Sequence, residues 1–191
     1  MKNIGNMIKL GLILAVFATA ACVMLAFVYT GTAPQIERRR LIDLEDAQKN
    51  VFPDADVFVA TEGIASADDS VIIASAYLAD RGGIPVGATL EVVSRRGYGG
   101  PITMMVGVGS DGLITGVRIM EHSETPGLGA NAVSHSFLNQ FINKSANDAF
   151  EVKNDVNAIT AATITSRAVA RAVKAAGVAT LARFGSAGGV Q

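Results

Sequence analysis

The stretch ITMMVGVGSDGLITGVRIM, residues 102–120, decides the fold class of this chain. It contains two runs rich in strand-favouring residues, 102–108 and 113–120, with Asp111 and Gly112 between them. Asp-Gly accepts the positive φ angles that a tight hairpin requires, so this pair between two such runs is a strong hairpin signal. We therefore predict an antiparallel β-hairpin over these residues.

The segments around this hairpin extend the β region and then change to a helical pattern. Earlier strand-like runs lie at 57–59, 71–78 and 90–94, with a glycine-rich separator at 82–87. Two later segments, 131–143 and 167–184, carry apolar residues at helical spacing. Strands followed by helices, without regular alternation, indicate an α+β domain with an antiparallel sheet and packed helices.

A long uncharged segment, residues 10–30, precedes this domain. As a helix rising about 1.5 Å per residue it would be about 31 Å long, which matches the hydrocarbon core of a bilayer. We interpret it as an uncleaved transmembrane anchor. The alternative is processing at or near the single Cys22, which follows small residues as in a lipoprotein signal, although the apolar run continues past it.

The predicted boundaries follow from these segments. Residues 1–9 precede the span, and a helix break around Pro34, at 30–34, is expected at the membrane surface. Residues 31–53 are predicted to form a juxtamembrane helix and linker, with the helix over 35–51. The folded domain is predicted over 54–185, and 186–191 as a flexible tail.

The charge pattern restricts the function and leaves the orientation open. A net charge of −1 provides no electrostatic basis for binding nucleic acid. Lys2 and Lys9 favour an N-terminus on the inner side of the membrane, whereas the three arginines at 38–40 favour the opposite orientation.

Several kinds of catalytic centre are missing from the sequence. Two His, together with one Cys inside the apolar segment, do not make a metal cluster in the domain. There is no G-x-S-x-G elbow and no Walker A loop, and the glycine-rich residues 97–100 enter a strand rather than open a helix. We therefore expect no metal site, no catalytic side chain and no independent NAD site.

Three stretches are nevertheless unusual for ordinary loops. GYGGPI, residues 97–102, has three glycines that either form a plain turn or let a ligand approach the backbone. EHSETPGLG, residues 121–129, places a Pro-Gly turn in a narrow loop, where His122 is more often structural than functional. NAITAATITS, residues 157–166, brings four hydroxyl side chains just ahead of a helical pattern.

The last of these stretches has more hydroxyl groups than a helix start needs. Thr165 or Ser166 can cap a helix that begins near Arg167, which leaves Thr160 and Thr163 without a role. The free N–H groups and the dipole of a helix N-terminus favour an anion such as phosphate. The residues alone leave plain capping and phosphate binding both open, and they favour capping.

Taken together, in this order and behind one N-terminal span, the motifs GYGGPI, HSETPGLG and NAITAATITSRAV resemble a known family. They resemble the G subunit of the Rnf ion-translocating electron-transport complex and the related C subunit of the sodium-pumping NADH:quinone oxidoreductase. The resemblance covers the whole chain, and its length of 191 residues suits the Rnf protein. It implies one transmembrane helix followed by one FMN-binding domain.

The resemblance implies that FMN is held covalently, through a phosphoester bond to a threonine. The family's attachment motif, Asp-x-x-Ser/Thr-Gly-Ala-Thr, falls on residues 157–163 and makes Thr163 the attachment residue. Thr160 and Ala162 match this motif. Asn157 stands where Asp is usual, and Ala161 stands where Gly is usual.

A separate flavin transferase that reads this motif is implied as a maturation partner, so both departures bear on how efficiently the chain is modified. Asp155 is a nearby acid that could stand in for the missing Asp, but it lies two residues out of register with the motif. Around the attachment point, further residues are expected to contribute to the flavin site: Thr160, Ala162, Thr165, Glu124, Thr125, Leu128, Gly129, Gly99 and Gly100.

The resemblance also implies a location and a role. We expect a single-pass protein of the cytoplasmic (inner) membrane, with residues 1–9 in the cytoplasm and the domain on the extracytoplasmic side. It would relay electrons through FMN as one component of a redox-driven ion pump, a translocase that couples ferredoxin and NAD, with other membrane subunits and the lipid bilayer as partners. A free-standing extracytoplasmic FMN-binding lipoprotein and a non-redox membrane-tethered adaptor remain the alternatives.

Overall fold

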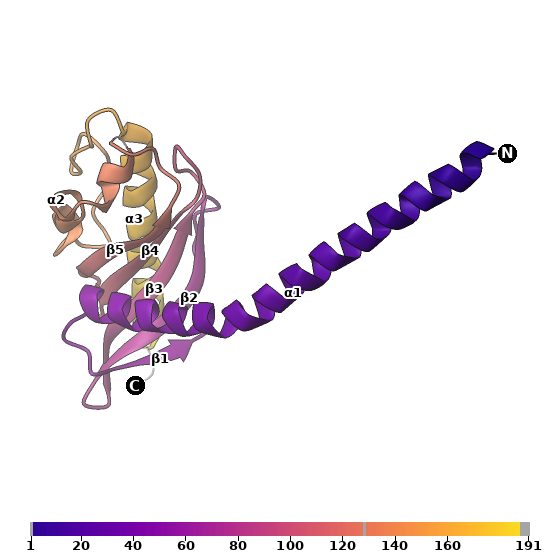
Figure 1. Cartoon of the computed structure of the whole chain (residues 1–191). Coiled ribbons are helices and arrows are strands. Elements are labelled where there is room, and N and C mark those ends of the chain that lie inside the picture. The colour runs from indigo at the N-terminus through magenta and orange to yellow at the C-terminus, as the bar shows by residue number, and fades with distance from the viewer. Residues whose placement is uncertain (1, 128, 188–191) are drawn as a thin grey trace. The chain divides into compact units, whose positions relative to one another are not determined.

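A computed structural model describes residues 2–127 and 129–187 of the chain (Figure 1). The chain divides into two compact units between Leu44 and Glu45, and each unit is described by itself. In chain order the elements are α1 (Lys2–Val51), β1 (Val57–Thr61), β2 (Val71–Arg81), β3 (Ile84–Ser94), β4 (Ile102–Gly109), β5 (Ile114–His122), η1 (Gly129–Val133), α2 (His135–Leu138), η2 (Asn139–Phe141) and α3 (Thr163–Ala187).

Helix α1 is continuous through Pro34, so the predicted break at 30–34 is wrong. Proline cannot donate to the carbonyl one turn earlier, which usually disrupts a helix. Here the hydroxyl of Thr32 donates to the Val28 carbonyl at 2.9 Å, and the hydroxyl of Thr30 donates to the Phe27 carbonyl at 3.0 Å. These bonds to the preceding turn are compatible with a helical backbone. The predicted helix end is confirmed, because α1 stops at Val51 before Phe52-Pro53.

The first unit, up to Leu44, consists of α1 alone and is apolar on all sides over much of its length. An 18-residue window of the helix has a mean hydropathy of 2.6, and none of that window is buried. Large apolar side chains such as Phe17, Leu25 and Phe27 are exposed. By length and composition the helix can cross a membrane, which agrees with the predicted span.

The second unit contains one five-stranded sheet in the order β1-β2-β3-β4-β5, with every neighbouring pair antiparallel. The predicted hairpin is confirmed: β4 and β5 pair directly, and the Gly109 N–H donates to the Leu113 carbonyl at 2.8 Å across the turn. Gly112 has a φ of 80° in this turn, which glycine adopts without strain. The sheet and its helices make the domain α+β, as predicted.

Helix α3 packs on one face of the sheet. The core between them contains Leu90, Met104 and Val106 from the strands and Val169 and Val173 from the helix. The helix begins four residues before the predicted start at 167 and continues through Ala187. Residues 186 and 187 of the predicted tail are thus assigned to α3, whereas 188–191 lie outside the described residues.

The helix predicted over 131–143 is wrong as a single element. The chain instead forms η1, α2 and η2 in succession. Ser134, between η1 and α2, has an extended ψ of 137°, and Asn143 ends the segment with a φ of 65°. These two backbone conformations interrupt the helical hydrogen bonds, although Phe137, Leu138 and Phe141 still reach the core, as their spacing predicted.

The opposite face of the sheet receives the last residues of α1. Gly107 and Gly116 are paired across β4 and β5, and a Cβ atom on either would collide with the backbone of Val51. The Thr115 hydroxyl donates to the Val51 carbonyl at 2.6 Å and so caps this helix end. Because this packing buries Ala47 and Val51, the compact unit begins at Glu45, earlier than the expected boundary at 54.

Candidate flavin site

A cavity of about 340 Å³ brings together the three stretches that the sequence singled out. Tyr98 comes from the first stretch, Glu124 and Gly129 from the second, and the remaining lining residues from the third: Ala161, Ala162, Thr163, Ile164 and Thr165. These stretches are far apart in the sequence. The sheet places the first two stretches next to each other. They adjoin β4 and β5, which are neighbouring strands, and Ile102 of β4 lies opposite His122 of β5.

Glu124 connects the three stretches through its carboxylate. The side chain is only 6% exposed. Its Oε1 accepts a hydrogen bond from the Gly99 N–H at 3.1 Å, and its Oε2 accepts one from the Thr165 hydroxyl at 2.8 Å. The Glu124 N–H in turn donates to Nδ1 of His122 at 3.2 Å, which gives His122 a structural contact. The carboxylate therefore fixes the two loops against the start of α3.

The glycines of these loops allow close packing of the protein on itself. A Cβ atom on Gly99 would collide with the Ser123 carbonyl, and one on Gly129 would collide with Oε2 of Glu124. Gly99 and Gly100 do not line the cavity. Their small size instead lets the two loops approach each other.

Thr163 is the first residue of α3 and is half-buried at the cavity wall. The N–H groups of the first helical turn lack partners within the helix and are oriented toward this end. Ser166 is inside the first turn, where its hydroxyl donates to the Ala162 carbonyl at 2.9 Å and accepts from the Ile159 N–H at 3.0 Å. The predicted capping by Thr165 or Ser166 is therefore wrong, because both hydroxyls follow the helix start and have other partners.

A tight turn precedes the helix. It is closed by the Ala162 N–H, which donates to the Ile159 carbonyl at 3.0 Å, and its third residue, Ala161, has a φ of 62°. Positive φ at the third position of such a turn favours glycine. This observation explains in physical terms why glycine suits this position of the motif. Thr160, the second residue of the turn, is exposed and does not line the cavity.

The remaining expectations concern Thr125, Leu128 and Asp155. Thr125 is exposed and outside the cavity lining, and Leu128 lies outside the described residues. Asp155, the acid two residues out of register, is engaged elsewhere: its carboxylate forms a salt bridge with Lys144 at 3.0 Å. It also accepts the N–H groups of Glu151 at 2.6 Å and Phe150 at 3.0 Å. Burial raises the pKa of Asp155, but these hydrogen bonds outweigh it and hold the pKa below its usual value.

The sequence motifs do not single out Tyr98 and Ile164, which both line the cavity. Each lies inside a motif whose glycines or hydroxyls are its most conspicuous feature. Their residue type could have identified them. A large apolar side chain in a loop, between small residues, has few core positions into which it can pack. Tyr98 is 70% exposed and Ile164 is 52% exposed.

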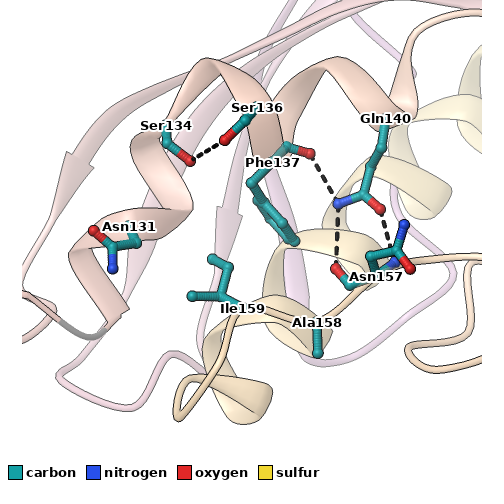
Figure 2. Close-up of a pocket in the computed structure, with 8 residues that line it drawn as sticks. All are labelled: Asn131, Ser134, Ser136, Phe137, Gln140, Asn157, Ala158 and Ile159. Atoms are coloured by element: carbon teal, nitrogen blue, oxygen red, sulfur yellow. Dashed lines mark hydrogen bonds between the residues drawn. The ribbon is translucent and has the colours of Figure 1, made fainter.

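A second groove of about 470 Å³ is lined in part by residues 157–159 (Figure 2). Figure 2 shows the Gln140 amide reaching the Asn157 backbone: Oε1 accepts from the Asn157 N–H at 2.8 Å, and Nε2 donates to its carbonyl at 3.3 Å and to the Phe137 carbonyl at 2.9 Å. Gln140 thus fixes the start of the stretch 157–166. Within the described residues, no group of three or more His, Cys, Asp or Glu is placed to hold a metal ion.

Comparison with known families and proteins gives consistent matches. Residues 97–177 match the FMN-binding domain, and residues 1–51 match the RnfG N-terminal region. The chain is 36% identical to the G subunit of the ion-translocating oxidoreductase complex of Vibrio cholerae, over 88% of this chain and 87% of that protein. It is also 36% identical to the G subunit of the Na⁺-translocating ferredoxin:NAD⁺ oxidoreductase complex of Acetobacterium woodii, over 86% and 87%.

A relative from Methanosarcina acetivorans extends these matches. The G subunit of the ion-translocating oxidoreductase complex of that organism is 33% identical, over 92% of this chain and 95% of that protein. The crystal structure of NqrC from Shewanella oneidensis is 22% identical over 72% of each chain, with a TM-score of 0.49. The identities over most of each chain and both family matches agree: the chain belongs to the family of G subunits of ion-translocating oxidoreductase complexes, and residues 97–177 belong to its FMN-binding domain.

Proposed function

We propose that this chain is the membrane-anchored flavoprotein component of an Rnf-type ferredoxin:NAD⁺ oxidoreductase and that it carries FMN on Thr163. One observation carries the proposal. Thr163 is the first residue of α3, and it lines a cavity that is built from all three motifs within the segment matched by the FMN-binding domain. The complex is inferred from the names of the relatives, which are subunits of ion-translocating oxidoreductase complexes.

The residues around Thr163 fit a flavin phosphate. The N–H groups and the dipole of a helix N-terminus favour an anion at this position. Ala161 and Ala162 are small, so they leave room for a phosphate beside the Thr163 hydroxyl. The cavity of about 340 Å³ is at the lower end of the size range of small-molecule sites, so the chain would hold a flavin with part of its ring system exposed. When bound, FMN supplies the electron chemistry, and the protein positions it.

Attachment requires an activated donor. The Thr163 oxygen would form a new bond to a flavin phosphorus atom, a phosphoanhydride bond of the donor would break, the hydroxyl proton would be released, and a nucleotide phosphate would leave. A donor of the flavin-dinucleotide class provides that anhydride bond, and a separate flavin transferase would catalyse the exchange. Once formed, the ester prevents loss of the flavin by dissociation.

The proposed setting is a single-pass protein with its domain on the extracytoplasmic side, which relays electrons between neighbouring subunits of the complex. NAD would bind to another subunit, since this sequence has no dinucleotide fingerprint.

Cysteine labelling tests on which side of the membrane the domain lies. Cys22 is replaced by Ala and the exposed Asp69 by Cys, and intact cells are treated with a membrane-impermeant maleimide. Labelling of intact cells supports the proposal, and labelling that requires lysis contradicts it.

The redox role is tested by visible absorption. The full chain is extracted from membranes after expression with and without a flavin transferase. We expect flavin bands that withstand denaturation, bleach with dithionite and return in air, but only in the sample made with the transferase. A colourless protein from both preparations would contradict the flavoprotein role and would favour the non-redox adaptor.

A further inference from the structure

We infer that Tyr98 and Ile164 form an apolar clamp for the isoalloxazine ring of a flavin tethered at Thr163. Both side chains line the same cavity as Thr163, and they come from different elements, the loop before β4 and the first turn of α3. The inference rests on the proposed function, because it concerns where the ring lies once the phosphate is attached. It adds two residues that neither the motif pattern nor the family matches assign.

The exposure of these side chains favours a ligand that covers them. Tyr98 is 70% exposed and Ile164 is 52% exposed, and both line the cavity beside Thr163. Single exposed apolar residues are common, but two that share the wall of one cavity form a patch suited to an apolar ligand. An isoalloxazine ring is flat, aromatic and apolar over most of its two faces. It would cover this patch, and stacking on Tyr98 would add to the apolar burial.

The backbone of Tyr98 is held in place on both sides. Gly97 and Gly99 flank Tyr98, and a Cβ atom on either would collide with neighbouring backbone, with the Gly100 carbonyl and the Ser123 carbonyl respectively. The Gly99 N–H is also bonded to the buried Glu124 carboxylate at 3.1 Å. The neighbours of Tyr98 are therefore packed into the protein, while the ring between them faces solvent. A side chain on such a fixed support binds with little loss of backbone freedom.

The lining of the neighbouring groove suits the ring less well. That groove, in Figure 2, is lined largely by polar side chains such as Asn131, Ser134 and Ser136, and its Gln140 amide is already engaged with the chain. The cavity at Thr163 offers the two exposed apolar side chains instead. Its volume is at the lower end of the range of small-molecule sites, so an edge of the ring would stay open for electron transfer to a neighbouring subunit.

The test uses the full chain purified with FMN attached, in wild-type form and as Tyr98→Phe, Tyr98→Ala and Ile164→Ser. Ile84→Ala is the matched control, because Ile84 is an equally exposed apolar residue at the far end of β3, about 30 Å along the strand from the loop that holds Tyr98. Peptide mass first confirms that each variant carries one FMN on Thr163. Flavin fluorescence and visible circular dichroism are then compared at equal flavin concentration.

Phenol in contact with an excited flavin quenches its emission by electron donation, whereas a phenyl ring does not. Tyr98→Phe should therefore raise flavin emission several-fold and keep the visible circular dichroism. Tyr98→Ala should raise emission and also reduce the dichroism several-fold, because the ring is no longer held in one orientation. Ile164→Ser should reduce the dichroism and make the emission more sensitive to iodide, and Ile84→Ala should change neither signal.

The inference is overturned if Tyr98→Phe and Tyr98→Ala both leave emission and dichroism at wild-type values while FMN is present on Thr163. Ser136→Ala and Gln140→Ala, in the groove of Figure 2, are included for that case. A change in those two variants alone would place the ring in that groove. Absence of FMN from the wild-type Thr163 would instead contradict the proposed function, so the two failures are distinguishable.

Discussion

At the scale of single residues, the buried carboxylate of Glu124 is the group on which the site depends. It accepts hydrogen bonds from the Gly99 N–H and from the Thr165 hydroxyl, so one side chain links two loops and a helix start. A buried carboxylate that loses a donor retains its desolvation penalty. The contribution of Thr165 to this site is therefore indirect: it orders Glu124 and, through it, the loop that carries Tyr98.

Thr165→Val removes this hydroxyl while keeping the shape of the side chain. We expect it to lower the free energy of unfolding by about 2 kcal/mol, since hydrogen bonds to charged groups contribute about 1.5–3 kcal/mol. The measurement is urea unfolding of the chain made without flavin transferase. Thr160→Val is the control, because Thr160 is exposed and outside the cavity lining, and it should change stability by less than about 0.5 kcal/mol. Equal effects of the two changes would contradict the role assigned to Thr165.

The left-handed backbone of Ala161 is a second residue-scale feature. A non-glycine residue with a φ of 62° carries strain of about 1–2 kcal/mol. Ala161→Gly should relieve it and raise the free energy of unfolding by about 0.5–1 kcal/mol after the entropy loss of glycine is subtracted. Ala161→Val should destabilise, because a β-branched residue is less tolerant of positive φ. A Gly variant that unfolds at lower urea concentration than wild type would contradict the strain assignment.

Asp155 provides a pH-dependent prediction. Its folded pKa is held below the ordinary value of 3.8, so its stabilising contribution is fully present above that value and is lost as pH falls through the folded pKa. Asp155→Asn should cost about 2 kcal/mol at pH 7, and the difference from wild type should shrink below about pH 4. Unfolding is measured between pH 7 and about pH 2.5, with the exposed Asp69→Asn as control. A difference that is constant over this range would contradict the role of the ionised carboxylate.

The residue-scale site was only partly predictable from the sequence. Thr163 follows from the motif pattern, and the structure places it in a cavity with parts of all three motifs. Capping was the wrong role for Thr165 because its partner cannot be seen locally, and it was the wrong role for Ser166 because the helix begins three residues earlier. Thr165 bonds to a carboxylate 41 positions away, and the helix start is set by the turn at Ala161 rather than by a capping side chain.

At the scale of elements, the last turn of α1 packs on the sheet within the second unit. The paired Gly107 and Gly116 let the Val51 backbone lie directly on the sheet, and the Thr115 hydroxyl caps the helix. In the sequence, these two glycines only lower the strand propensity of the two segments in which they lie. The hairpin was predictable because Asp111-Gly112 is a local signal. The long-range contact of Gly107 and Gly116 with Val51 was not predictable.

Gly116→Ala tests this contact. A Cβ atom there would lie 2.7 Å from the Val51 Cα, so α1 must shift. We expect destabilisation by about 2–3 kcal/mol, in the range of overpacked cores. Gly31→Ala is the control, because nothing lies within 4 Å of the added atom, and it should leave domain stability unchanged. Both are followed by thermal unfolding of the full chain in detergent. Wild-type stability of Gly116→Ala would show that α1 does not pack on the glycine pair.

At the scale of the whole molecule, the chain combines a helix long enough to span a bilayer with an α+β domain of the FMN-binding family. Both parts were predictable, since an uncharged span and a run of strands followed by helices are properties of long segments rather than of single contacts. The domain boundary was not, because the burial of Ala47 and Val51 depends on a sheet whose strands come later in the sequence. The proposed electron relay depends on Thr163 bearing a flavin at the cavity.

The most direct test of that claim is tandem mass spectrometry of the tryptic peptide 154–167 from the full chain expressed with a flavin transferase. We predict one added FMN mass, with the fragment ions assigning it to Thr163. Thr163→Val should abolish the modification, whereas Thr160→Val in the same peptide should retain it. An unmodified peptide from the wild-type chain, or FMN assigned to Thr160, Thr165 or Ser166, would contradict the proposal.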